Sequence, residues 1–307
     1  YTLATYDLLG RPISSTSADG SVNTLQYQGR TTRTTNALGQ TKTATKTIVG
    51  QDIEVLDTQN NALTYGYDTL GNLSWLRDAA GNQTYLVYNE RGFKTRMIDP
   101  NQGDWRYSYF VDGQLKSQTD AKGQVTQFTY DGLGRMKTRL ESTGTTTWTY
   151  DVGTKALGKL SSVVLGNTSE SYTYDALGRL DITTSTLEGQ TFAQDVDYDS
   201  TGRMLSLKYP NNYKVRYQYN NALGIVSNIT DDLGTTSFYK PTYMDAKGAT
   251  EAFTLGDKIN VTHDINDVTG LTNSINARVG TTTLQNLTYQ WDRIGNLTYQ
   301  WDTVNNL

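Results

Sequence analysis

The chain has 307 residues, a formal net charge of −4 and an isoelectric point of about 5.1, and it contains no cysteine. The lack of cysteine excludes disulfides and thiolate metal sites, and the mildly acidic balance argues against a nucleic-acid-binding surface. No run of about 18 apolar residues is present, so no membrane-spanning helix is expected. Hydrophobic residues make up only 36%, and 22 tyrosines supply much of the apolar area. This balance favours a thin sheet carrying large amphipathic rings over a thick aliphatic core.

In chain order, short strand-like segments alternate with turns, and no amphipathic stretch is long enough to predict a helix. Residues 1–60 carry the pattern loosely and residues 61–140 carry it most regularly. Between 141 and 220 the spacing stretches, which predicts longer loops near Gly153 and Leu187. Residues 221–285 keep turn chemistry only, and the pattern becomes regular again up to residue 302. We expect one continuous body over residues 1–307, without a globular domain boundary.

The repeated unit is clearest at Tyr130, where the sequence reads Tyr-Asp-Gly-Leu-Gly-Arg. Copies at positions 67, 88, 109 and 130 are 21 residues apart, and turn residues at 36, 57, 78, 99 and 120 keep the same period. Fixed self-similarity at such a period predicts a repeat architecture. The residues expected to form the structural repeat motif are Tyr6, Asp7, Gly10, Arg11, Tyr67, Asp68, Gly71, Tyr130, Asp131, Gly134, Arg135, Tyr174, Asp175, Gly178, Arg179, Tyr198, Asp199, Gly202 and Arg203.

One repeat, residues 120–140, predicts two antiparallel strands. Aspartate opens each turn because its carboxylate can accept hydrogen bonds from backbone N–H groups two residues on. Gly134 suits the positive φ of a type I turn closed by a G1 bulge. Because Gly144 lies outside the motif, we expect a side chain to cost more at Gly134. Phe128 and Tyr130 alternate with residues that point the other way, so the chain should be above about 45% strand and under about 8% helix.

Large side chains two positions before each motif tyrosine are expected to hold the hairpins in register. They share a face with the tyrosine because strand side chains alternate. If the hairpins stack in register, alternate strands bring them into columns across the sheet, in which each cross-strand aromatic pair contributes roughly 0.2–1 kcal/mol. These residues are Tyr65, Leu86, Tyr107, Phe128, Trp148, Tyr172, Val196 and Tyr217.

Three features resemble chemical sites, but each has a simpler structural explanation. The segment 153–160 approaches a P-loop, yet leucine stands where Mg²⁺ binding requires serine or threonine. Asp195, Asp197 and Asp199 resemble the start of a calcium loop, but serine replaces both its glycine and its final glutamate. His263 is the only histidine and has no recognisable partner for general-base catalysis. We therefore predict no catalytic, cofactor-binding or metal-binding residue.

The motif copies at 130, 174 and 198 resemble the YD repeats of Rhs proteins, of the BC components of bacterial Tc toxins, and of teneurins. The resemblance covers nearly the whole chain. It implies an all-β fold, in which continuous antiparallel β-hairpin repeats form a curved spiral sheet that is part of a hollow β-shell. In bacterial members the shell encloses a toxic C-terminal polypeptide. The autoproteolytic core motif and the variable toxin segment of a complete member are not seen, so neither self-cleavage nor toxin activity is carried over.

The leading hypothesis is a non-enzymatic structural shell segment of an Rhs or Tc-type toxin that encapsulates and carries a polypeptide cargo. Its expected partners are that cargo or flanking shell repeats, with no cofactor, nucleic acid or membrane span. The resemblance implies a secreted or cell-surface location in bacteria. The alternative is an extracellular adhesion or carbohydrate-binding scaffold, in which exposed tyrosines, Trp291 and Trp301 stack on a glycan. The rings follow the repeat instead of gathering in one patch, which favours packing over sugar binding. A polysaccharide-degrading enzyme is a third hypothesis.

Both ends of the chain fall within repeats, so we expect residues 1–307 to be a fragment of a longer chain. About 13 to 15 repeats would give up to roughly 29 strands, spaced about 4.8 Å apart. Such a ribbon can curl once but cannot also cap both ends of a large cavity. We expect an open, strongly curved segment whose terminal strand edges favour self-association.

Overall fold

The computed structural model describes residues 2–220 and 222–305. The chain ends, on which the fragment interpretation depends, lie partly outside these residues. More than half of the described residues are in strands and none is in a helix, so the predicted secondary-structure content is confirmed. No described helix, accordingly, is long and apolar enough to cross a membrane.

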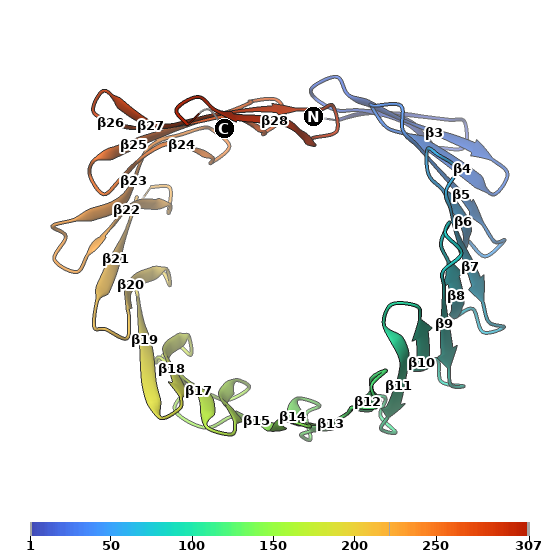
Figure 1. Cartoon of the computed structure of the whole chain (residues 1–307). Helices are drawn as coiled ribbons and strands as arrows, with labels where there is room; N and C mark the ends of the chain where they lie inside the picture. The colour runs from blue at the N-terminus through green and yellow to red at the C-terminus, as the bar shows by residue number, and fades with distance from the viewer. Residues whose placement is uncertain (1, 221, 306–307) are drawn as a thin grey trace. The chain divides into compact units, whose positions relative to one another are not determined.

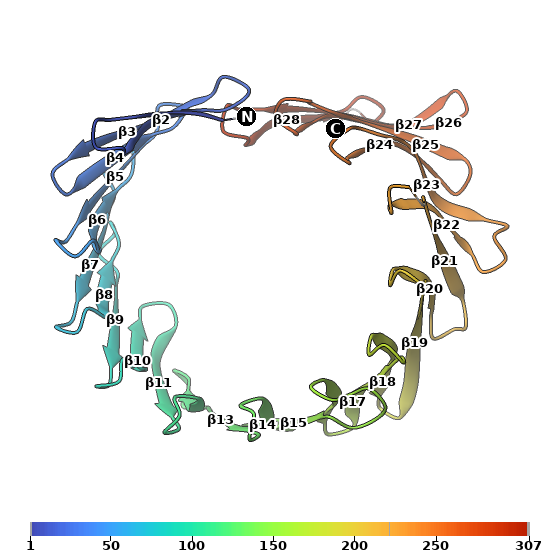
Figure 2. The ribbon, with the colours of Figure 1, turned by 180° about the vertical axis from the view of Figure 1, so that it is seen from behind.

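The chain divides into two compact units, residues 1–148 and 149–307. Figures 1 and 2 show the strands of each unit side by side in chain order, following an arc. The first unit contains β1 (Leu3–Tyr6), β2 (Pro12–Thr16), β3 (Val22–Gln28), β4 (Thr31–Thr35), β5 (Thr41–Lys46), β6 (Asp52–Leu56), β7 (Ala62–Tyr67), β8 (Leu73–Arg77), β9 (Gln83–Tyr88), β10 (Lys94–Asp99), β11 (Gly103–Tyr109), β12 (Leu115–Thr119), β13 (Val125–Tyr130), β14 (Met136–Glu141) and most of β15 (Gly144–Tyr150). The second contains β16 (Leu160–Leu165), β17 (Thr168–Tyr174), β18 (Leu180–Leu187), β19 (Gln190–Tyr198), β20 (Met204–Lys208), β21 (Lys214–Tyr219), β22 (Val226–Asp231), β23 (Ser237–Met244), β24 (Thr250–Leu255), β25 (Ile259–Ile265), β26 (Thr272–Val279), β27 (Thr282–Trp291) and β28 (Leu297–Asp302).

Within each unit, consecutive strands pair antiparallel and each is joined to the next by a turn. In β13 and β14, Gln127 lies opposite Leu140 and Thr129 lies opposite Thr138. The register then shifts just before Tyr130, and the same shift precedes the tyrosine that ends β7, β11 and β19. This is the recurring bulge that the turn chemistry predicted. The all-β fold of antiparallel hairpin repeats is therefore confirmed.

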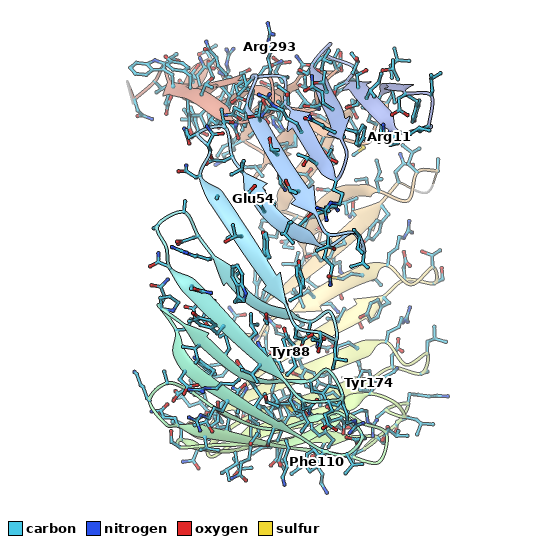
Figure 3. All side chains as sticks on the ribbon, turned by 90° about the vertical axis from the view of Figure 1, so that its right-hand side faces the viewer. Arg11, Glu54, Tyr88, Phe110, Tyr174 and Arg293 are labelled. Atoms are coloured by element: carbon cyan, nitrogen blue, oxygen red, sulfur yellow. The ribbon has the colours of Figure 1, made fainter. Side chains whose placement is uncertain are left out.

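The sheet of each unit is a single layer, and side chains project from both of its faces (Figure 3). Strand β13 shows the predicted alternation: Phe128 is 8% exposed, whereas Val125, Gln127 and Thr129 on the other face are exposed. Among the described residues the buried apolar side chains are few, namely Phe128, Ala156, Val215 and Val261. Stability must therefore come mainly from contacts between neighbouring hairpins, as in other repeat proteins.

The motif turn is built around one left-handed glycine. In the turn between β13 and β14, the N–H of Asp131 donates to the carbonyl of Arg135 at 2.9 Å, and the N–H of Gly134 donates to the carbonyl of Asp131 at 3.0 Å. Gly134 has a φ of 80°, and a Cβ atom there would lie 3.0 Å from the side-chain nitrogen of Gln114. Both the backbone conformation and the neighbouring side chain favour glycine at this position.

The reason given for a lower cost at Gly144 does not hold, because this glycine also has a positive φ, of 135°. Gly144 opens β15 and lies opposite Glu141 across a short hairpin turn. The hairpin, and not the six-residue motif, therefore imposes its conformation. Gly132 is a better reference position: it lies in the same turn as Gly134, it is not among the positive-φ residues, and a Cβ atom there meets nothing within 4 Å.

Gly134→Val is expected to destabilise the chain by about 1–3 kcal/mol, because a β-branched residue is strained at positive φ. Gly132→Val, two residues away, should cost much less. Urea unfolding followed by circular dichroism compares the two variants with the wild type. Equal shifts of the unfolding midpoint would contradict this account of the turn.

The predicted columns of aromatic residues were wrong in their partners. The columns were expected on alternate strands, but Tyr107 lies opposite Gln118, and Gln118 lies opposite Thr126 and not Phe128. Phe128 lies opposite Arg139. The guanidinium of Arg139 also lies 5.8 Å from the ring of Trp148 on β15. Long polar side chains thus lie beside the rings along these rows, and their stems supply part of the apolar contact.

Candidate functional site

The turns of each unit lie at two opposite edges of its sheet, because successive strands are antiparallel. We call the edge with the turns from odd-numbered to even-numbered strands the motif edge, and the opposite one the half-phase edge. The motif tyrosines are the final residues of the strands that lead into the motif edge; those predicted are Tyr6, Tyr67, Tyr130, Tyr174 and Tyr198. Tyr88, labelled in Figure 3, ends β9 in the same way.

The motif aspartate organises its own turn. One carboxylate oxygen of Asp131 accepts hydrogen bonds from the backbone N–H groups of Leu133 and Arg135, at 2.9 and 3.0 Å. The other accepts from the Nε of Arg135 at 2.7 Å and forms an ion pair with that guanidinium. The remaining predicted motif residues take equivalent places, with aspartates Asp7, Asp68, Asp175 and Asp199, glycines of positive φ Gly10, Gly71, Gly178 and Gly202, and paired arginines Arg11, Arg179 and Arg203.

These contacts lower the pKa of the turn carboxyls. The hydrogen bond from the side chain of Asn72 is the strongest cause of the lowered pKa of Asp68. Burial acts in the opposite direction, and hydrogen bonds from backbone N–H groups of the turn lower the pKa further. At Asp57, on the half-phase edge, the side chain of Asn61 is again the main cause of the lowered pKa. Each such aspartate binds its proton less readily in the folded chain than in the unfolded chain, whose pKa is about 3.9.

Replacing Asp57 and Asp68 together by asparagine is expected to make the chain less sensitive to acid. A depressed folded pKa contributes stability above about pH 4, which is lost as the pH falls through the folded pKa. Asparagine keeps the oxygen that accepts the turn N–H groups, as Asn89 does for Arg91 and Phe93. Melting temperatures at neutral pH and near pH 3 test this. An unchanged difference between the two pH values would argue against a stabilising role for the charges.

The tyrosine hydroxyl links one repeat to the preceding one. The hydroxyl of Tyr130 donates to the carbonyl of Leu115 at 3.0 Å, and Leu115 begins β12 directly after the previous motif turn. Burial raises the pKa of Tyr130, and the nearby Asp112 charge raises it further, so the hydroxyl stays protonated as a donor. The same link is made by Tyr27, Tyr67, Tyr109, Tyr174, Tyr198 and Tyr219.

Tyr130→Phe is expected to lower stability by about 0.5–1.5 kcal/mol, the usual net contribution of one hydrogen bond. The ring stays in place, so the change isolates the hydroxyl. Tyr85→Phe on β9 is the control, because that side chain is 46% exposed. Chemical denaturation compares the two variants, and equal losses would show that the link between repeats carries no special stability.

The sixth motif position contacts the tyrosine of the next repeat, a relation that the sequence analysis missed. The guanidinium of Arg11 lies 4.2 Å from the ring centre of Tyr27, and Phe93 stacks on Tyr109 at 5.1 Å. Where the residue is Gln114, its side-chain amide instead donates to the carbonyl of Gly134 at 2.9 Å. Arginine, phenylalanine and glutamine all reach the next motif turn along this edge. Their constant spacing to the following tyrosine was the signal that could have revealed the contact.

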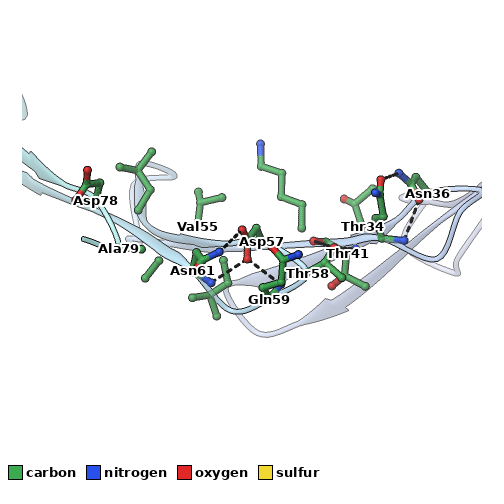
Figure 4. Close-up of a pocket in the computed structure, with 15 residues that line it drawn as sticks. Thr34, Asn36, Thr41, Val55, Asp57, Thr58, Gln59, Asn61, Asp78 and Ala79 are labelled. Atoms are coloured by element: carbon green, nitrogen blue, oxygen red, sulfur yellow. Dashed lines mark hydrogen bonds between the residues drawn. The ribbon is translucent and has the colours of Figure 1, made fainter. Parts of the chain in front are cut away.

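A shallow hollow of about 700 Å³ lies on the half-phase edge of the first unit (Figure 4). Its apolar wall includes Val55 and Leu63. The polar groups at its rim belong to turns: Asp57 binds the backbone N–H groups of Gln59 and Asn61. The hydroxyl of Thr58 accepts from the N–H of Thr41 and donates to its carbonyl, so this group also holds the turns in place.

The other weighed candidates make structural contacts. The ammonium of Lys159, in the P-loop-like segment, donates to the carbonyl of Gly178. Asp197 pairs with Lys214 at 2.7 Å, whereas Asp199 binds its own turn, so the calcium-like carboxylates have separate partners. His263 bonds to the hydroxyl of Thr272 at 2.8 Å. Over the described part of the chain, no group of three or more histidine, aspartate or glutamate side chains is placed to hold a metal ion.

The tryptophans considered for sugar binding each stack on a tyrosine of their own strand. The indole N–H of Trp291 donates to the carbonyl of Thr272 at 2.7 Å, and its ring stacks on Tyr289. Trp301 stacks on Tyr299, and both residues are on β28. These contacts do not favour the carbohydrate-binding alternative, because the rings already stack on other residues of the same chain.

Comparison with protein families gives one match, over residues 111–146, to the family described as RHS Repeat. A curated relative, the double-stranded DNA deaminase toxin A of Burkholderia cenocepacia, is 28% identical over 141 residues. That alignment covers 45% of this chain and 10% of the relative. The chain therefore corresponds to only about a tenth of that relative's length.

Solved structures match over almost the whole chain. A Tc holotoxin pore of Photorhabdus luminescens gives a TM-score of 0.87 at 15% identity, covering 98% of this chain and 18% of that chain. The TcdB2–TccC3 complex gives a TM-score of 0.88 at 14% identity, with the same coverage. At this identity the likeness shows the fold alone. The predicted fold class, hairpin repeats of the kind found in a Tc toxin shell, is thereby confirmed.

Proposed function

We propose that the chain is a member of the YD-repeat, or Rhs, family and forms a non-enzymatic wall segment of a toxin shell that encloses and carries a polypeptide cargo. The observation that carries the proposal is the fold match to Tc toxin structures over 98% of the chain. Because the match covers 18% of that chain, we also propose that residues 1–307 are one segment of a longer shell protein, secreted or exposed at the surface of bacteria.

A structural role fits the contacts at both edges. The side chains that most resemble catalytic or ligand-binding groups, such as the motif aspartates and Lys159, form hydrogen bonds within turns and between repeats. A wall needs such repeated local contacts, since each hairpin is stabilised only by its neighbours. A single-layer sheet also leaves one face to contact a cargo and the other to contact solvent.

Protease protection tests the cargo role. The polypeptide that contains residues 1–307 is given an epitope tag at its C-terminal end and digested with proteinase K. We expect the tag to resist digestion until the protein is denatured. In a variant with Gly134→Val and Gly178→Val, which strains two motif turns at positive φ, the tag should be digested sooner. Gly132→Val is the control and should protect as the wild type does. Equal digestion of the tag in native and denatured wild type would contradict encapsulation.

A further inference from the structure

The motif edge of the first unit carries a row of apolar side chains that the turn itself does not require. Turn positions normally favour glycine, proline, asparagine, aspartate and serine. Of the twelve residues between the opening residue and the glycine in six of these turns, seven are apolar and each of these is at least 70% exposed, while Glu90 and Arg91 interrupt the row. Leu133, at the tip of the turn after β13, is 77% exposed. The row consists of Leu8, Leu9, Ile48, Val49, Leu70, Val111 and Leu133.

The half-phase edge of the same unit lacks such a row. Its turns carry mostly polar or small residues at the position equivalent to Leu133, namely Asp19, Gln59, Ala80 and Lys122, with Leu38 as the exception. Both edges use the same turn chemistry, so turn formation does not explain the difference. An apolar row on one edge alone indicates an interaction surface. In the second unit, Leu157, Leu177 and Leu223 occupy the motif edge in the same manner.

The charges of the motif turns of the first unit nearly balance, with Arg11, Arg30, Arg91 and Arg135 against Asp7, Asp68, Glu90, Asp112 and Asp131. Asp7 pairs with Arg11 at 2.7 Å, and Asp131 pairs with Arg135 at 2.6 Å. At Asn89 the opening residue carries no charge. Two copies of this edge can therefore approach each other with little repulsion, whereas an edge of one charge sign would select an oppositely charged partner.

The spacing of the motif turns and the exposed area of the row also suit contact with a second copy of the chain. Successive motif turns are two strands apart, or about 9.6 Å, so a second row can insert its side chains into the gaps of the first. Each exposed side chain offers on the order of 100 Å², and seven of them approach the roughly 800 Å² that one partner buries in a standard interface. A row that faces itself across a two-fold axis forms a closed, isologous contact.

We propose that the apolar row of the motif edge is the docking surface for a second copy of this chain, edge against edge. This contact differs from pairing of the exposed terminal strands, because it uses turn tips and no backbone hydrogen bonds between copies. It also holds whether or not the chain encloses a cargo.

Sedimentation velocity of the 307-residue chain over the micromolar range tests the proposal. The row variant carries Leu9→Asn, Leu70→Asn and Leu133→Asn, since asparagine is well tolerated in turns. The matched control carries the same number of leucine-to-asparagine changes at the half-phase edge, at Leu38, Leu187 and Leu233, which are also exposed. Circular dichroism verifies that both variants keep their strand content.

We expect a dimer for the wild type and the control, and at least a tenfold weaker association for the row variant. A wild type that stays monomeric throughout would overturn the proposal. So would a dimer that survives in the row variant but is lost when Thr5→Pro blocks the terminal strand β1 (Leu3–Tyr6). Binding of the chain to phosphatidylcholine vesicles that depends on the same leucines would overturn it in favour of a lipid surface.

Discussion

Phe128→Ala is expected to destabilise the first unit by about 3 kcal/mol, the lower end of the usual range for removing a buried aromatic ring. Phe128 is 8% exposed, in a protein where few apolar side chains are buried. It lies in a row with Arg139 and Thr146 on the next two strands, so its loss removes contacts on one face of several hairpins. A single-layer sheet admits water at the vacated site, which keeps the cost below that of a closed cavity.

Urea unfolding of the Phe128 variant, followed by far-ultraviolet circular dichroism, measures this loss. Val125→Ala is the matched control on the same strand, because Val125 is 47% exposed on the opposite face. It should change the free energy of unfolding by less than about 0.5 kcal/mol, as surface substitutions usually do. If the two variants lose the same stability, the face that carries Phe128 is not the packed one.

Gly66→Val is expected to cost at least about 1–3 kcal/mol, the usual range for overpacking. Gly66, on β7, lies directly opposite Trp75 on β8. A Cβ atom at Gly66 would lie 1.9 Å from the Nε1 and 2.2 Å from the Cε2 of the indole ring. The ring covers the glycine backbone, so a side chain there must displace it.

The double variant Gly66→Val with Trp75→Ala separates this clash from the general effect of a mutation in the strand. We expect the valine to cost much less once the indole is gone, which gives a coupling energy of roughly 0.5–3 kcal/mol in a double-mutant cycle. Thermal unfolding of the four proteins supplies the cycle. Strictly additive effects would mean that the ring moves away from Gly66 at no cost.

The regular features of the fold follow from local sequence, and the structure agrees with them. The position of Asp131 and Gly134 in the repeat predicts the turn, and alternation around Phe128 predicts the packed face. The turn and the packed face both depend on residues that are close together in the sequence, so the sequence shows them directly. The same reasoning failed at Gly144, whose positive φ of 135° comes from a short hairpin and not from the repeat motif.

Contacts between repeats were harder to predict, because they depend on register and on the reach of long side chains. The expected aromatic columns assumed that rings two strands apart share one row, but the row of Tyr107 reaches Thr126, and not Phe128, on β13. The contact of Arg11 with Tyr27 joins residues on different hairpins, so no pattern within one repeat reveals it. The exposed row at the motif edge is visible in the sequence only after the turns have been assigned to two edges.

Electron cryomicroscopy of the whole polypeptide that contains residues 1–307 is the most direct test of the central claim. The account predicts that these hairpins form part of a wall, continued by further strands, around density that does not belong to the sheet. A sealed and empty shell made by residues 1–307 alone would contradict it. So would separate domains, each with a core of its own.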